Sequence, residues 1–110
     1  MESMFEIQGN CLVIRIPGEL DHPVSDHIRK ESDAIMRKTY IRTIIFDFSD
    51  TQFMDSSGIG LIMGRYRALG MRGDCIRAVH TGAHIRKLLR LSGVHRYMEI
   101  SEESEGEPVE

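Results

Sequence analysis

The chain has 110 residues, 41% hydrophobic and 28% charged, which suits one globular domain with a single core and is too short for a second. No apolar run approaches the roughly 18 residues that span a bilayer, and the N-terminal residues lack a secretory signal, so we expect a cytoplasmic location away from membranes. The net charge is −3 because residues 99–110 hold six glutamates, and the basic residues before them are too scattered to indicate direct nucleic-acid binding.

The first predicted elements are a hairpin and a helix. Apolar residues alternate with other residues on both sides of Gly9-Asn10, which predicts two antiparallel strands containing Phe5, Ile7, Leu12, Ile14 and Ile16. Pro17-Gly18 ends the second strand. Apolar residues then recur at helical spacing over residues 23–39, and Asp21 or His22 is placed to precede that helix.

Strands and helices alternate in the rest of the chain. The apolar run over residues 43–48 is rich in β-formers and predicts a central strand covered on both faces. Apolar residues at three- and four-residue spacing predict a second helix over 59–69. Three further elements follow: a strand over 75–79, a helix over 83–91 and an edge strand over 97–100.

The order β-β-α-β-α-β-α-β predicts an α/β fold. We expect a mixed β-sheet of about four to five strands, with helices packed on it through right-handed crossovers. This domain covers residues 1–100. Residues 101–110 are rich in Glu, Ser and Gly and lack aromatic residues, which predicts a disordered acidic tail.

One segment carries candidate chemistry: Phe53-Met54-Asp55-Ser56-Ser57-Gly58-Ile59-Gly60. It places two hydroxyls and a carboxylate where a loop becomes a helix. Unpaired backbone N–H groups and the helix dipole favour an anion there, so a phosphate on a serine would be well tolerated. In the alternative interpretation, Asp55 or Ser56 is only an N-cap, and the segment alone leaves both interpretations open.

The segment and the rest of the chain resemble the SpoIIAA-like anti-sigma factor antagonists, members of the STAS domain family. The resemblance covers roughly residues 4–100 and implies a single STAS-type domain. It is carried by three blocks: Gly18-Glu19-Leu20-Asp21-His22; Phe53-Met54-Asp55-Ser56-Ser57-Gly58 with Gly60 and Gly64-Arg65-Tyr66; and Arg86-Lys87-Leu88-Leu89 with Ser92-Gly93.

The resemblance implies a phosphorylation switch at Ser56. In that family the serine directly after the aspartate is phosphorylated by the partner, an anti-sigma factor serine kinase of the SpoIIAB type, and a phosphoserine phosphatase resets the switch. The unphosphorylated form is expected to bind the kinase and free a sigma factor, in sporulation or a stress response. A phosphate adds roughly −1.5 to −2 charge beside Asp55, which would break the complex through repulsion and desolvation.

Other residues are expected to contact that partner. Asp21 and His22 belong to a family loop near the phosphoacceptor, although a helix cap and an exposed imidazole explain them equally well. Glycines in a helix lower its stability, so they indicate close approach of either the sheet or a partner backbone. Arg65 is expected on the exposed side of its helix, as a contact or as part of a solvated basic face. The expected partner-binding residues are Asp21, His22, Asp55, Ser57, Gly58, Gly60 and Arg65.

The sequence lacks the motifs that would indicate an enzyme, a metal site or a cofactor site. No Gly-x-Ser-x-Gly surrounds Ser56, the five histidines have no metal-ligand spacing, and Gly58-Ile59-Gly60 does not continue as a phosphate-binding loop. Cys11 and Cys75 form no Cys-x-x-Cys pair and are expected to be buried thiols. We therefore expect a protein that is not an enzyme and needs no cofactor or metal. The alternative function is a STAS ligand-sensing or scaffold module without a phosphoswitch.

Overall fold

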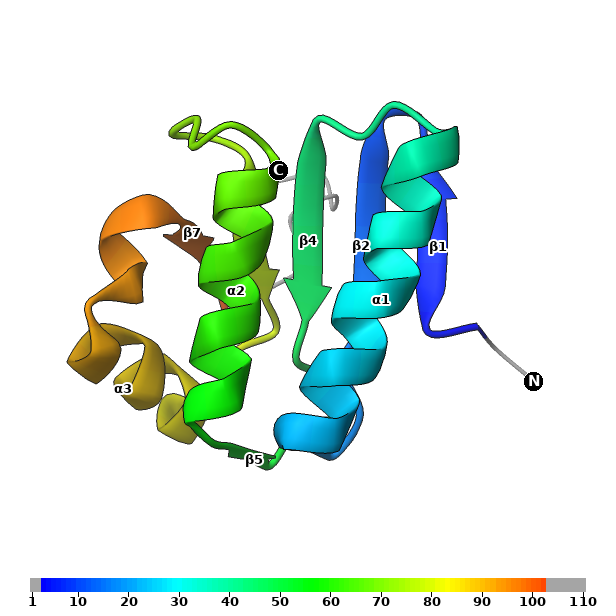
Figure 1. Cartoon of the computed structure of the whole chain (residues 1–110). Helices are drawn as coiled ribbons and strands as arrows, with labels where there is room; N and C mark the ends of the chain where they lie inside the picture. The colour runs from blue at the N-terminus through cyan, green and yellow to red at the C-terminus, as the bar shows by residue number, and fades with distance from the viewer. Residues whose placement is uncertain (1–2, 103–110) are drawn as a thin grey trace, which may run out of the picture.

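A five-stranded sheet forms the centre of the computed structural model, which describes residues 3–102 (Figure 1). The spatial order is β1-β2-β4-β6-β7, and β1 pairs antiparallel with β2 while the other pairs are parallel. The strands are β1 (Phe5–Gln8), β2 (Cys11–Arg15), β4 (Thr43–Asp47), β6 (Ile76–Val79) and β7 (Glu99–Ile100). The predicted α/β architecture with a mixed sheet is therefore confirmed.

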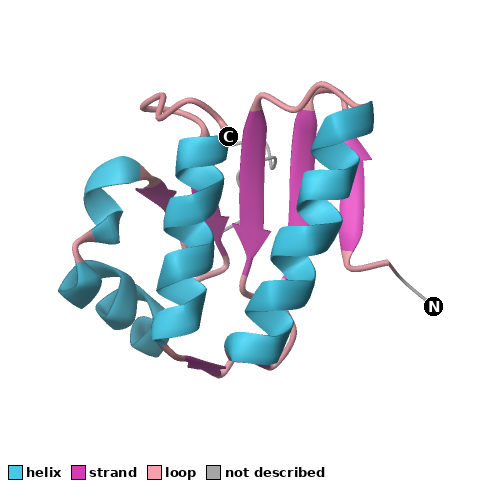
Figure 2. Cartoon of the chain, viewed as in Figure 1, coloured by secondary structure: helices cyan, strands magenta, loops and turns pink. Residues whose placement is uncertain are grey.

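Three helices connect the parallel strands: α1 (His22–Lys38), α2 (Ser56–Ala68) and α3 (Ala83–Ser92). Figure 2 shows α1 and α2 side by side in front of the sheet, with α3 near the beginning of α2. Gly93 ends α3 in the left-handed conformation, with φ of 84°, and a short 3₁₀ helix, η1 (Val94–Tyr97), leads into β7. The edge strand predicted over residues 97–100 begins only at Glu99, because Tyr97 belongs to η1.

The apolar core lies between the sheet and the helices α1 and α2. Alternate residues of β2 and β4 point toward the helices and are fully buried, namely Leu12, Ile14, Ile44 and Phe46. From the helices, Ile28 of α1 and Ile62 of α2 pack into the same core. The helical and alternating spacings that predicted these elements therefore mark the residues that meet in the core.

The prediction that the central strand is covered on both faces is wrong. Along β4, Ile44 and Phe46 are buried, but Thr43, Ile45 and Asp47 on the opposite face are only half-buried. Strands β2, β4, β6 and β7 follow one another in a single direction across the sheet. Because each crossover between parallel strands is right-handed, a sheet that grows in one direction receives its helices on one face.

A second, two-stranded sheet was not predicted. Strand β3 (Glu19–Leu20) pairs in parallel with β5 (Phe53–Met54), and the register places Leu20 opposite Met54. Two residues are too few to produce a recognisable alternation, so the sequence carries no signal for these strands. The pairing matters because it sets the starts of α1 and α2 next to each other.

The end of the described chain contacts the domain at two residues. The backbone N–H of Ser101 donates to the carbonyl of Ala78 at 2.9 Å, and Glu102 lies 3.2 Å from Arg86. These two residues, predicted to begin the disordered tail, thus extend the folded domain to Glu102. The remainder of the predicted tail, 103–110, lies outside the described residues.

Candidate functional site

Two strand-to-helix junctions with the same local geometry form one end of the molecule. Strand β3 leads through Asp21 into α1, and β5 leads through Asp55 into α2. Their backbone angles nearly coincide, with φ and ψ of −105° and −170° at Asp21 and of −107° and −171° at Asp55. The backbone N–H of Asp55 donates to the carbonyl of Leu20 at 3.2 Å, which ties the junctions together. We call the surface formed by Asp21, His22, Asp55, Ser56 and Ser57 the cap surface.

Each junction has an aspartate as its N-cap. The Oδ1 atom of Asp55 accepts the backbone N–H of Ser57 at 2.8 Å, and that of Asp21 accepts the N–H of Val24 at 3.3 Å. Such bonds satisfy N–H groups that have no partner within the helix. The cap of α2 is therefore Asp55, and the hydroxyl of Ser56 is not needed for this purpose.

The two serines face different neighbours. Ser56, the first residue of α2, is exposed, and its hydroxyl forms no hydrogen bond with any residue in the described range 3–102. Ser57 is half-buried, and its Oγ lies 3.5 Å from Nδ1 of His22 on α1. Of these two hydroxyls, only that of Ser56 is both exposed and unengaged.

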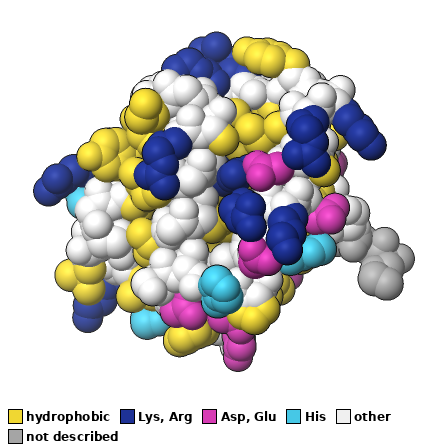
Figure 3. All heavy atoms as spheres, in the orientation of Figure 1, with side chains coloured by type: hydrophobic (Ala, Val, Ile, Leu, Met, Phe, Trp, Pro, Cys, Tyr) yellow, Lys and Arg dark blue, Asp and Glu magenta, His cyan; other side chains and the backbone are white. Residues whose placement is uncertain are grey.

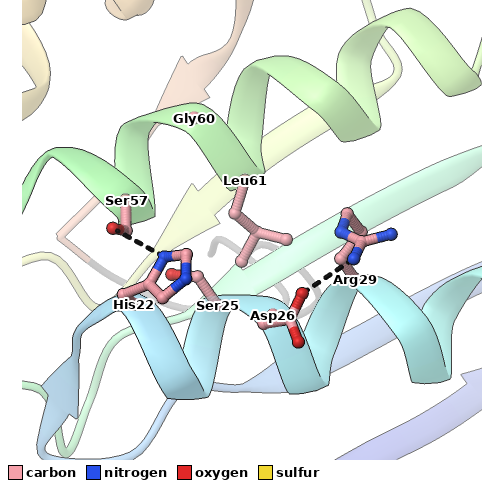
Figure 4. Close-up of a pocket in the computed structure, with 7 residues that line it drawn as sticks. All are labelled: His22, Ser25, Asp26, Arg29, Ser57, Gly60 and Leu61. Atoms are coloured by element: carbon pink, nitrogen blue, oxygen red, sulfur yellow. Dashed lines mark hydrogen bonds and ion pairs between the residues drawn. The ribbon is translucent and has the colours of Figure 1, made fainter.

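Acidic and histidine side chains gather around this end of the molecule. In Figure 3 they lie at the lower edge, where Figure 1 places β5 and the first turns of α1 and α2. A pocket of about 200 Å³ between these two turns is lined by His22, Ser25, Asp26, Arg29, Ser57, Gly60 and Leu61 (Figure 4). Hydrogen bonds from Arg29 and Lys30 lower the pKa of Asp26, so this carboxylate stays ionised at neutral pH.

Gly58 and Gly60, both predicted to contact a partner, differ in their surroundings. Gly58 is buried, and a Cβ atom there would lie 2.6 Å from Cγ of Met54 and 2.8 Å from Cδ2 of Leu20. Gly58 therefore allows α2 to pack against β3 and β5, and the prediction that it binds a partner is wrong. Gly60 is exposed, and no atom of the described chain lies within 4 Å of where its Cβ would be.

The prediction that Arg65 lies on the exposed side of α2 is wrong. Its side chain is 6% exposed, and Nη1 lies 2.6 Å from Oδ1 of Asp33 and 2.9 Å from Oγ of Ser32. The guanidinium thus joins α2 to α1 and is not accessible to a partner. Sequence spacing could not reveal this, because the acidic partner is 32 residues away in the chain.

An apolar hollow on the other side of Ser56 was missed by the sequence analysis. It is lined by Met54, Asp55, Ser56, Ile59, Leu88, Leu91 and Ser92. Leu91 is 75% exposed and Phe53, on the neighbouring strand β5, is 47% exposed. Leu91 could have indicated this hollow from the sequence, because it is an apolar residue on the otherwise basic outer side of α3.

Comparison with known proteins supplies the family. Residues 2–106 match the family model of the STAS domain. The chain belongs to the STAS domain family. This assignment confirms the family that the sequence blocks around Asp21, Ser56 and Leu88 indicated.

The relatives of this STAS domain include named regulators. The anti-sigma F factor antagonist of Paenibacillus polymyxa is 35% identical over 95 residues, which cover 86% of this chain and 81% of the relative. The anti-sigma F factor antagonist of Lysinibacillus sphaericus is 34% identical over 92 residues, which cover 84% of this chain and 79% of the relative. The solved structure of the antagonist SpoIIAA in its unphosphorylated form gives a TM-score of 0.77 at 33% identity, covering 87% of this chain and 84% of that one. The solved structure of the phosphorylated form of SpoIIAA from Bacillus gives a TM-score of 0.67 at 36% identity, and the match covers 87% of each chain.

The described part of this STAS domain offers neither a metal site nor a membrane-spanning helix. Within residues 3–102, no group of three or more His, Cys, Asp or Glu side chains could hold a metal ion. In the same range, no helix has both the length and the apolar character needed to cross a membrane. Cys75 is buried as predicted, whereas Cys11 is half-buried, and burial raises the pKa of both thiols.

Proposed function

We propose that this STAS domain is an anti-sigma factor antagonist whose unphosphorylated form binds an anti-sigma factor serine kinase and thereby releases a sigma factor. The observation that carries the proposal is the hydroxyl of Ser56, which is exposed at the first position of α2 and makes no hydrogen bond within the described part of the chain. Because Asp55 already caps the helix, this serine is available as a phosphoacceptor. The names of the relatives, anti-sigma factor antagonists, support the same role.

Phosphorylation acts on the complex and leaves the fold intact. A phosphate on Ser56 adds roughly −1.5 to −2 charge at the start of a helix, where an anion is tolerated. Inside an interface the same charge must lose water beside the carboxylates of Asp55 and Asp21, and the complex dissociates. The similarity of this chain to both the unphosphorylated and the phosphorylated form of SpoIIAA supports a switch without refolding.

Ser57 is not the phosphoacceptor in this proposal. Its hydroxyl faces α1 and lies 3.5 Å from the imidazole of His22, whereas Ser56 faces solvent and the apolar hollow beside α3. A kinase that approaches the cap surface from outside would therefore meet the hydroxyl of Ser56 first.

The partner-binding surface is the cap surface together with Gly60. Asp21, His22, Asp55 and Ser57 contact the anti-sigma factor in this proposal, and Gly60 lets it approach α2 closely. Gly58 and Arg65 are excluded because both are buried. Leu91, on the far side of the apolar hollow, extends the contact surface with an exposed apolar group.

A phosphoserine phosphatase returns the protein to its binding form. The chain is the substrate of both the kinase and the phosphatase in this scheme and catalyses no step itself. Because a sigma factor acts with RNA polymerase, the protein acts in the cytoplasm in this scheme.

Intact-mass analysis tests the switch and its site. We expect wild type and Ser57→Ala to gain one phosphate, and Ser56→Ala none, when each is incubated with ATP and the anti-sigma factor kinase encoded in the same genome. The kinase is first shown to be active by its autonomous hydrolysis of ATP. If wild type then gains no phosphate, the phosphoswitch is refuted, and a ligand-sensing or scaffold STAS module becomes the better account.

A further inference from the structure

A small polar pocket adjoins the cap surface, between the first turns of α1 and α2. Its volume is about 200 Å³, whereas pockets that hold drug-sized ligands measure roughly 300–1,000 Å³. Figure 4 shows His22 and Ser25 reaching up from α1, while Ser57 and Leu61 reach down from α2. The pocket therefore has room for one side chain of a bound protein.

Ser25 brings to this pocket a hydroxyl whose hydrogen bonding is incomplete. The residue is 6% exposed, and its Oγ has no hydrogen-bond partner among residues 3–102. In Figure 4 the hydroxyl points away from α1 into the space between the two helices. A buried hydroxyl without a protein partner is free to hydrogen-bond with a polar group that enters the pocket.

Gly60 borders the same pocket and keeps its mouth open. A glycine at an exposed helix position lowers stability relative to alanine. Packing within the described chain does not require it, because the position of its missing Cβ is surrounded by open space. At the edge of the pocket, this open space lets a group from outside approach the backbone of α2 closely.

The groups that line the pocket define the chemistry of that approaching group. Arg29 and Asp26 are paired with each other at 2.7 Å, so their charges are already compensated. The remaining polar groups are the hydroxyls of Ser25 and Ser57 and the imidazole of His22. Because Asp26 and Arg29 already neutralise each other, neither a carboxylate nor an ammonium group would find a free counter-charge among these lining groups. An apolar group would leave Ser25 without a partner, so an uncharged group that can donate and accept hydrogen bonds fits best.

We propose that this pocket receives a hydroxyl or carboxamide side chain of the anti-sigma factor, which hydrogen-bonds to Ser25 and passes over Gly60. This inference rests on the proposed function, because its partner is the protein that the cap surface binds. It adds to that function a specific anchoring point, which is formed by the segments 22–29 and 57–61.

The test compares affinity with stability in three variants. Ser25→Ala removes the buried hydroxyl and Gly60→Ala narrows the mouth, and we expect each to bind the cognate anti-sigma factor about tenfold more weakly. Neither variant should lower Tm, and Gly60→Ala should raise it by a few degrees. Gly64→Ala is the matched control, since Gly64 lies one turn further along α2, outside the pocket, with open space around it in the described chain. It should gain stability and keep the wild-type affinity.

The outcomes separate the inference from the function on which it rests. If wild type binds the anti-sigma factor and both Ser25→Ala and Gly60→Ala bind equally well, the anchoring pocket is refuted and the proposed function stands. A fall of several degrees in the Tm of Ser25→Ala would also refute it, because the hydroxyl would then serve the fold. If wild type neither binds the anti-sigma factor nor accepts a phosphate from it, the proposed function fails, and the inference fails with it.

Discussion

Gly58 and Gly60 are two residues apart on α2, but the absence of a side chain has a different cause at each. Gly58 faces inward, where Met54 and Leu20 occupy the space that a Cβ would need. Gly60 faces outward, where the described chain leaves that space empty. The same residue type thus serves packing at one position and, in our proposal, recognition at the other.

This difference predicts opposite effects on stability. Gly58→Ala should lower the free energy of unfolding by about 1–2 kcal/mol, because overpacking a core costs about 1–3 kcal/mol and exceeds the gain in helix propensity of up to about 1 kcal/mol. Urea denaturation followed by circular dichroism measures this change. Gly64→Ala, with open space around it, should instead gain up to about 1 kcal/mol. An unchanged or higher stability for Gly58→Ala would contradict the packing role.

The ion pair between Arg65 and Asp33 is one of the contacts that join α2 to α1. Arg65 is nearly buried, while the side chain of Asp33 is 36% exposed and also lies 3.9 Å from Arg29. Removing the arginine would leave the carboxylate partly solvated and would open a gap between the helices.

Arg65→Ala is expected to lower the free energy of unfolding by about 2–3 kcal/mol. That is less than the 3–5 kcal/mol typical of breaking a fully buried pair, because Asp33 retains water and Arg29. Arg67→Ala, on the exposed side of the same helix, should change stability by less than about 0.5 kcal/mol. Chemical denaturation of both variants provides the measurement. Full stability of Arg65→Ala combined with weaker partner binding would restore Arg65 as a contact residue.

The elements differ in how far the sequence could predict them. The hairpin and the three helices contain apolar residues at regular spacing, and this periodicity was sufficient to predict them. Strands β3 and β5 contain two residues each and have no period. The burial of Arg65 depends on the position of α1 beside α2, which spacing within α2 cannot show. The lower burial of Thr43, Ile45 and Asp47 on one face of β4 depends on the order of the strands in the sheet. Ser56 and Asp55 could be found from their motif, but the different directions of Ser56 and Ser57 could not.

At the scale of the whole molecule, the proposed switch is separated from the core. Ser56 lies on the cap surface at one end, whereas the core residues lie between the sheet and the helices. A charge added at this end meets solvent in the free protein and a desolvated interface in the complex. Phosphorylation should therefore change the binding free energy far more than the free energy of unfolding.

The most direct test is the affinity of the anti-sigma factor for the stoichiometrically Ser56-phosphorylated protein beside the unphosphorylated protein, with Tm measured on both. We expect phosphorylation to weaken binding by about 100-fold or more, since burying an unpaired charge costs several kcal/mol. The Tm should change by no more than a few degrees. Equal affinities of the two forms, or a phosphorylated protein that has lost its fold, would contradict the account.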